Sequence, residues 1–178
     1  MIRLIDGANR SLQAAARHEA AHAAAAFVLG WEPVEIELKP DGSAHCDAVA
    51  PEQIGAHARR EQWTQILLAP SFHVGAEGAA ADRLDADKEI RHLAKQQLFP
   101  FEWLRDRLRQ RTRDLVATSQ FRRAAQYVGV VLLERGYLGA IELAQLLGDA
   151  RADCEAIARG VPPPIRLQRD EAVVASSR

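Results

Sequence analysis

The alternation of apolar and polar positions along this chain predicts a mainly helical fold with one small β-hairpin. Alanine dominates residues 14–29, without proline or interior glycine, which predicts a buried helix between Ser11, a good N-cap residue, and Gly30. Apolar residues and glutamates then alternate over residues 34–38, as in a half-buried strand. The turn sequence KPDG and an extended stretch over residues 43–49 complete the hairpin.

The rest of the chain carries helical patterns that proline, glycine and aspartate separate. Pro51 suits the first position of a helix, because the N–H that proline lacks has no partner there in any case. The stretch 69–87 is rich in glycine, alanine and aspartate, which predicts a loop. Helices are expected over residues 51–68, 87–98, 99–117, 120–136, 140–147 and 151–158.

No internal repeat or linker divides this pattern before the last helix. We therefore expect a single helical domain over residues 1–160. From the sequence GVPPP onward, the composition predicts an irregular or disordered tail over residues 161–178.

Composition agrees with a globular domain and disfavours several classes of protein. Hydrophobic residues make up 48% and the net charge is −1, so neither disorder nor a general affinity for nucleic acid is indicated. The two cysteines are far apart, which argues against a disulfide framework and a cysteine-rich zinc site. There is no phosphate-binding loop, no apolar signal segment and no stretch long enough to span a bilayer. We expect a cytoplasmic protein.

The alanine-rich helix contains an HExxH motif, formed by His18, Glu19 and His22. Residues four apart lie on one helix face, so both imidazoles can reach the same metal ion. Zinc binds histidine nitrogen, and a neighbouring glutamate can take a proton from water. A metal would also be the polar partner that buried histidines need. The alternative is a surface helix with two solvated histidines.

A catalytic zinc needs a third protein ligand and one open position. The metzincin motif is absent, because Ala25 and Val28 stand where it needs a glycine and a histidine. Glu35 and Glu37 fall in the predicted strand rather than on a second helix. The remaining candidates are Glu77, Asp82, Asp85 and Asp87, with His45, His73 and His92 as outsiders.

The motif and the order of the segments around it resemble the FtsH-type zinc peptidase domain. HEAAHAAAAFVLGWEPVEIELKPDG resembles its motif helix and the strand that follows. ILLAPSFHVGAEGAAADRLDADKEIRHLA resembles the stretch in which a small-residue loop leads to an aspartate-bearing helix, and QYVGVVLLERGYLGAIELAQLL resembles the C-terminal segment. The resemblance covers residues 14–148, and HExxH is its only specific motif. Ala21 replaces a glycine of the family, which is a small change.

This resemblance implies a zincin-like, FtsH-type core of several packed helices. His18 and His22 match the zinc ligands of the family, and Glu19 matches its catalytic glutamate. The aspartate ligand maps onto the DADKEI segment. There we choose Asp87 over Asp85, because the apolar residues at +3, +7 and +11 place Asp87 on the inward face of its helix. The alternative for an acid at a helix N-terminus is a capping charge.

The expected activity is hydrolysis of peptide bonds by a zinc metalloendopeptidase-like hydrolase. Since the sequence shows neither the ATPase module nor the membrane segments of the family, we expect a stand-alone enzyme that does not depend on ATP. The substrate would be a peptide or a flexible protein, and the chain would act as a homo-oligomer or with a separate partner protein. The alternatives are a non-catalytic helical binding module with a structural or vestigial metal site, and a regulatory HExxH protease of another lineage.

Three further features each have two interpretations. The edge of the hairpin could bind an extended peptide by strand addition, or it could simply face solvent. Cys46 lies near the motif and could approach zinc, although a packed thiol is the more ordinary role. The arginine-rich segment 105–113 is interrupted by acids and lacks aromatic spacing. This favours a solvated helix face or an oligomer contact over nucleic-acid binding.

Overall fold

The protein is mainly helical with a small three-stranded antiparallel sheet, as the pattern predicts. The computed structural model describes residues 3–73 and 79–162. In chain order the elements are α1 (Arg3–Val28), β1 (Glu32–Leu38), β2 (Ala44–Val49), α2 (Ala56–His73), α3 (Ala80–Gln97), α4 (Phe101–Ala117), α5 (Ser119–Arg135), β3 (Tyr137–Gly139) and α6 (Ala140–Ala158).

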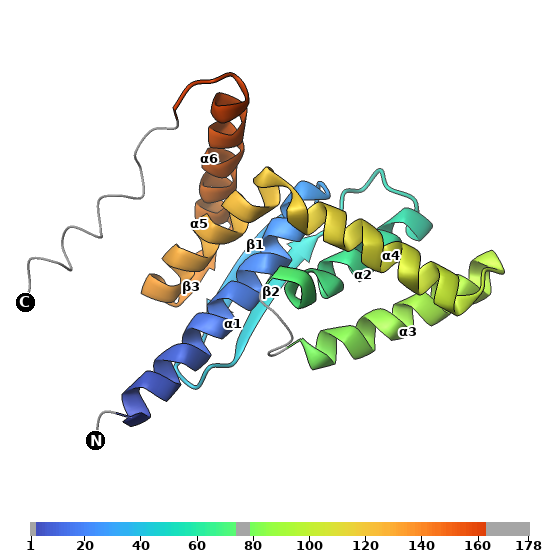
Figure 1. The fold of residues 1–178 in the computed structure, drawn as a ribbon, viewed down its shortest axis with the longest axis horizontal. Coiled ribbons are helices and arrows are strands. Elements are labelled where there is room, and N and C mark those ends of the chain that lie inside the picture. Colours follow the sequence, from blue (N-terminus) through green and yellow to red (C-terminus); the bar gives the residue numbers. More distant parts are fainter. Residues whose placement is uncertain (1–2, 74–78, 163–178) are drawn as a thin grey trace, which may run out of the picture.

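Helix α1 runs through the middle of the fold and packs against α2, α5 and the sheet (Figure 1). Its second half is lined with alanines that have almost no exposed surface, including Ala16, Ala20 and Ala24. Small side chains let neighbouring helices approach closely, and Gly129 of α5 lies directly over Ala20. The alanine run therefore serves the packing of the core, and the HExxH motif lies inside it.

The sheet has the strand order β2-β1-β3, so β1 is central and β2 is an edge strand. Ile36 of β1 pairs with Cys46 of β2 on one side and with Leu138 of β3 on the other. Strand β3 was not predicted, because three residues are too short to show an alternating pattern. Ile36 and Leu138 are buried beneath the helices.

Helices α3 and α4 form a hairpin that extends to the right in Figure 1. They share a second apolar cluster, which contains Ile90, Leu93, Leu104 and Leu108. Helix α2 packs against both of them and also against α1. It thus connects the α3–α4 hairpin to the central helix.

Helix boundaries differ from the prediction at four places. Helix α1 begins at Arg3, eight residues before Ser11, the predicted N-cap residue. Helix α2 begins at Ala56 rather than Pro51, and it continues through Pro70 to His73. Helix α3 begins at Ala80, seven residues before the predicted start. Its N-cap residue is Ala79, whose side chain makes no capping hydrogen bond, so the usual sequence signal for a helix start is missing.

The two predicted C-terminal helices are one continuous helix, α6. Its buried face runs through Leu143, Leu147 and Ala150, so packing spans Gly148, where the prediction placed a break. The predicted tail over residues 161–178 lies almost entirely outside the described residues. In the part of the chain that the structure describes, none of the helices combines the length and apolar character needed to cross a bilayer.

Candidate metal centre

Helix α1 presents the three residues of the HExxH motif toward α2 and α3. His18 and His22 are one helical turn apart, and their Nε2 atoms lie 3.2 Å from each other. Glu19 and His22 are 7% and 9% exposed, so the motif is not the solvated surface pair of the alternative interpretation. Burial of these polar groups on an alanine-rich helix requires partners for them.

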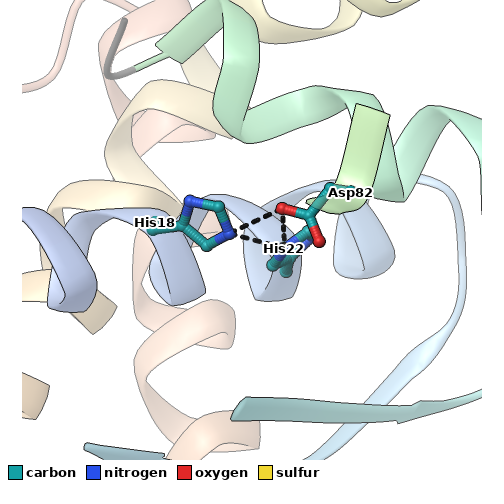
Figure 2. A group of neighbouring side chains, drawn as sticks. All are labelled: His18, His22 and Asp82. Atoms are coloured by element: carbon teal, nitrogen blue, oxygen red, sulfur yellow. Dashed lines mark hydrogen bonds and ion pairs between the residues drawn. The ribbon is translucent and has the colours of Figure 1, made fainter. Parts of the chain in front are cut away.

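Asp82, from the first turn of α3, supplies a carboxylate to both histidines (Figure 2). Its Oδ2 atom lies 2.8 Å from Nε2 of His18 and 3.5 Å from Nε2 of His22. Asp82 is one turn before Ala86 and two turns before Ile90, and both of these are fully buried. The face of α3 that packs into the core therefore also carries Asp82 to the histidines.

A backbone carbonyl of α2 fixes the ring of His22. The Nδ1 atom of His22 lies 3.0 Å from the carbonyl oxygen of Ile66. A proton on Nδ1 that is donated to this oxygen leaves Nε2 with a free lone pair, which points toward His18 and Asp82. Metal-binding histidines in proteins are usually held by a hydrogen bond of this kind.

Pro70 explains why the carbonyl of Ile66 is available. In a regular helix that oxygen would accept a hydrogen bond from the N–H of the residue four positions later. In α2 that residue is Pro70, which has no N–H, although the helix continues beyond it to His73. The carbonyl of Ile66 therefore has no competing donor from its own helix, and it accepts the proton of His22.

The three donor atoms have the spacing of a metal site. Two ligands at about 2.0–2.1 Å from a tetrahedral zinc are about 3.3 Å apart, and the distances among His18, His22 and Asp82 scatter around this value. Oδ2 of Asp82 is buried and has no hydrogen-bond donor of acceptable geometry among the described residues. Two imidazoles and a carboxylate are ligands that zinc accepts, so the residues present fit a metal ion of this kind.

The charges of the site favour an ionised aspartate. Burial opposes the charge on Asp82, but the two adjacent histidines outweigh it and hold the pKa of this carboxyl well below its usual range. Burial likewise disfavours the charged form of His18, yet contact with Asp82 and the negative charges of Asp82 and Glu19 raise its pKa overall. The same carboxylate that would bind a cation thus attracts protons to the histidines when no cation is bound.

Glu19 lies beside the three donor atoms but does not belong to their group. Burial raises the pKa of its carboxyl above the ordinary value, and the nearby histidines reduce this rise. A carboxylate that is partly desolvated and close to a cation site is a stronger proton acceptor than one in water. This is the environment that a general base requires.

A pocket of about 230 Å³ opens over the centre. Its polar lining consists of His18, Glu19, His22, His45 and Asp82, and the edge strand β2 and helix α2 contribute the apolar lining. This apolar lining includes Ala44, Cys46, Ala48, Trp63, Ile66 and Leu67. Burial strongly raises the pKa of the Cys46 thiol, so Cys46 is a packed thiol rather than a thiolate ligand.

The aspartate that the structure brings to the histidines is Asp82, and Asp87 lies outside this group. Asp87 is five residues further along α3 and therefore projects from a different face of the helix. Asp85 is exposed and pairs with Lys88 at 2.7 Å. Glu77, another candidate from the sequence, lies outside the described residues.

The outlying histidine candidates do not belong to the group of three donor atoms either. His73 stacks edge-on against Phe121, with ring centroids 5.3 Å apart, and His92 is exposed. His45 lies on the edge strand β2, where it groups with Glu35 and Asp47. This second group is largely exposed, but His45 also lines the pocket over the HExxH centre, and its charge is one of those that lower the pKa of Glu19.

Comparisons with known proteins add no family assignment. No protein-family model matches the chain, and no curated protein matches its sequence.

Proposed function

We propose that this chain is a zinc-dependent metallopeptidase with a zincin-like, FtsH-type core. In this proposal His18, His22 and Asp82 bind the metal, and Glu19 is the general base. The observation that carries the proposal is the convergence of three donor atoms from two helices, next to a buried glutamate and inside a pocket. Asp82 takes the place that the sequence analysis gave to Asp87.

Zinc bound by two histidines and a carboxylate acts as a Lewis acid that activates water and polarises a carbonyl group. Three protein ligands leave one of the four zinc positions free for this chemistry. A structural zinc site, in contrast, usually has four protein ligands. The donor set favours a catalytic over a structural role.

Glu19 supplies the proton transfers of the reaction. Its carboxylate accepts a proton from the attacking water, and it donates that proton to the nitrogen of the leaving amine. The raised pKa that burial causes makes both transfers easier near neutral pH, because the acid and base forms then lie closer in energy. His22 is meanwhile held in one orientation by the carbonyl of Ile66.

The substrate in this proposal is a peptide or a flexible protein segment. Strand β2 is an edge of the sheet and forms one wall of the pocket, so it offers unpaired backbone groups next to the donor atoms. An extended chain can pair with such an edge by strand addition. The apolar lining favours a substrate with an apolar side chain beside the bond that is cleaved.

The test is hydrolysis of a fluorescently labelled casein, an unfolded substrate, by the parent protein and by Glu19→Gln in the presence of zinc. Glu19→Gln should retain the metal and lose about 10²-fold or more in rate, because it cannot accept a proton. Glu52→Gln, an exposed glutamate outside the pocket, is the matched control and should hydrolyse as the parent does. Equal rates for Glu19→Gln and the parent would refute the mechanism, and a zinc-loaded parent without activity would favour a binding module.

A further inference from the structure

A second hollow lies between α1 and α5, apart from the candidate metal centre. It has a volume of about 580 Å³, within the usual range of about 300–1,000 Å³ for small-molecule sites. Gln13 and Arg17 line it from α1. Gln13 and His22 are nine residues apart and therefore project from opposite sides of the helix. We call this hollow the α1–α5 groove, and we define it by its lining: Gln13, Ala16, Arg17, His73, Arg122, Ala125, Gln126, Gly129, Val130 and Leu133.

The charges of the groove are all of one sign. Arg17 and Arg122 line it, and none of the described lining residues is acidic, although the chain as a whole has a net charge of −1. The hydrogen bond of Arg122 is a long one of 3.5 Å, to the carbonyl of Thr118 in its own helix. Several arginines elsewhere on the molecule do have acidic partners, as in the pairs Arg60–Glu89, Arg111–Glu61, Arg123–Asp153 and Arg135–Glu142.

His73 strengthens this asymmetry. Its ring lies in the lining, and burial together with the positive charge of Arg17 lowers its pKa. A neutral imidazole there can donate a hydrogen bond, while the two guanidinium groups provide charge. The polar part of the groove is therefore complementary to a carboxylate or another anion.

The remaining lining is apolar and partly open to solvent. Val130 and Leu133 are 43% and 38% exposed, although both are large apolar residues. They lie about 12 and 16 Å along the helix from Arg122, at about 1.5 Å per residue. Gly129, which lies between Arg122 and Val130 in α5, also lines the groove and has no side chain that would fill it. Along α5 the groove thus runs from a cationic end at Arg122 to an apolar end at Val130 and Leu133.

From this distribution we infer that the α1–α5 groove binds a small anionic amphiphile, with its anionic group at Arg17 and Arg122 and its apolar chain along Val130 and Leu133. Fatty acids and related apolar carboxylates have this chemistry. An acid group satisfies guanidinium groups for which the described residues provide no carboxylate partner, and the chain covers apolar surface that otherwise contacts water. The inference does not depend on the proposed peptidase activity, because it uses other residues on another side of α1.

The test is isothermal titration calorimetry of the full chain with decanoate, below the concentration at which it forms micelles. Decanol has the same chain without the charge, and acetate has the charge without the chain. The groove should bind decanoate at about one molecule per chain and at least about tenfold more tightly than either control.

Two variants locate the site. Arg122→Gln should weaken decanoate binding about tenfold, because a hydrogen bond to a charged group is lost, and Leu133→Asp should weaken it at least as much. Arg151→Gln, an exposed arginine of α6 outside the groove, should bind as the parent does. All of these positions are exposed, and circular dichroism verifies that each variant is folded.

Three results would overturn the inference. Equal affinity for decanol and decanoate would show an apolar surface without anion recognition. Unchanged decanoate binding in both Arg122→Gln and Leu133→Asp would place the ligand elsewhere. Absence of decanoate binding, with Arg122-dependent binding of an acidic peptide instead, would assign the groove to a protein partner.

Discussion

Pro70 shows how one residue of α2 contributes to the metal centre without contacting it. The proline leaves the carbonyl of Ile66 without its regular helical donor, and His22 supplies the proton instead. The resulting hydrogen bond selects the tautomer of His22 that has a free Nε2. The helix tolerates Pro70 close to its end, where only a few hydrogen bonds follow.

Replacement of Pro70 by alanine should weaken metal binding. The new N–H of residue 70 would compete for the carbonyl of Ile66, and His22 would be held less firmly. We expect the zinc dissociation constant to rise about three- to tenfold. Complete loss of a hydrogen-bond partner of a metal ligand typically costs about 10- to 100-fold, and here the hydrogen bond is only weakened. Competition with a chromophoric chelator measures it, and Pro51→Ala, outside the helices, is the control. An unchanged constant for Pro70→Ala would mean that the carbonyl of Ile66 accepts both donors without loss.

A buried polar cluster between α5 and α6 gives a prediction about stability. Asp153 is 2% exposed, and its carboxylate accepts a hydrogen bond from the hydroxyl of Tyr127 and lies 3.5 Å from Arg123. Tyr127→Phe removes that donor and leaves a buried carboxylate less well paired. The free energy of unfolding should fall by about 1–3 kcal/mol in urea titrations.

Tyr137→Phe is the matched control, because its hydroxyl contacts Glu35 on the exposed face of the sheet. It should change the free energy of unfolding by less than about 0.5 kcal/mol. Equal losses for the two variants would contradict the assignment of Asp153 and Tyr127 as a stabilising buried pair.

At the residue scale, local spacing accounts for what the sequence could predict. His18, Glu19 and His22 lie within one helical turn, so their common location follows from helix geometry alone. Asp82 could not be selected, because α3 begins among alanines without a capping side chain. The match of the DADKEI segment to the family, with the apolar residues at +3, +7 and +11, led to Asp87 instead. The only sign of Asp82 in the sequence is that the apolar residues Ala86 and Ile90 follow it by one and two turns, and the structure shows both to be buried.

At the scale of elements, the contact between α1 and α5 depends on small residues. A side chain added at Gly129 would place its Cβ 3.5 Å from that of Ala20, which is ordinary contact. Gly129→Ala should therefore be accommodated, and the free energy of unfolding should rise by about 0.5–1 kcal/mol because alanine favours the helix.

A larger residue at Ala20 should have the opposite effect. Ala20 is fully buried beneath α5, so Ala20→Leu forces the helices apart and should lower the free energy of unfolding by about 1–3 kcal/mol. Ala152→Leu, at an exposed position of α6, controls for the change of residue type. Thermal or urea unfolding measures all three variants. A destabilised Gly129→Ala or an unaffected Ala20→Leu would contradict this packing of α1 and α5.

Elements with strong local signals were predicted, and those that depend on tertiary contacts were not. The hairpin of β1 and β2 follows from alternation and a turn sequence. Strand β3 exists because it pairs with β1, more than ninety residues earlier in the chain, and no local pattern marks it. Helix α6 is continuous because Leu143, Leu147 and Ala150 are buried on one face. Packing there outweighs the preference of Gly148 for a break.

At the scale of the whole molecule, the candidate metal centre joins parts that have separate cores. Helix α1 belongs to the main apolar cluster, whereas α3 and α4 share a cluster of their own. Asp82 reaches from the second unit to the histidines of the first (Figure 2). Helix α2 lies between them and contributes the carbonyl that orients His22. A metal at this point would tie the α3–α4 hairpin to the central helix.

The most direct test of this account is the metal content of the natively purified protein, measured by elemental mass spectrometry for the parent, Asp82→Ala and Asp87→Ala. We predict about one zinc per chain in the parent and in Asp87→Ala, and much less in Asp82→Ala, because a three-ligand site loses most of its affinity with one ligand. Zinc retained by Asp82→Ala, with loss from Asp87→Ala, would contradict the site described here. Absence of metal from the parent, even after zinc is supplied, would contradict the proposed metallopeptidase itself.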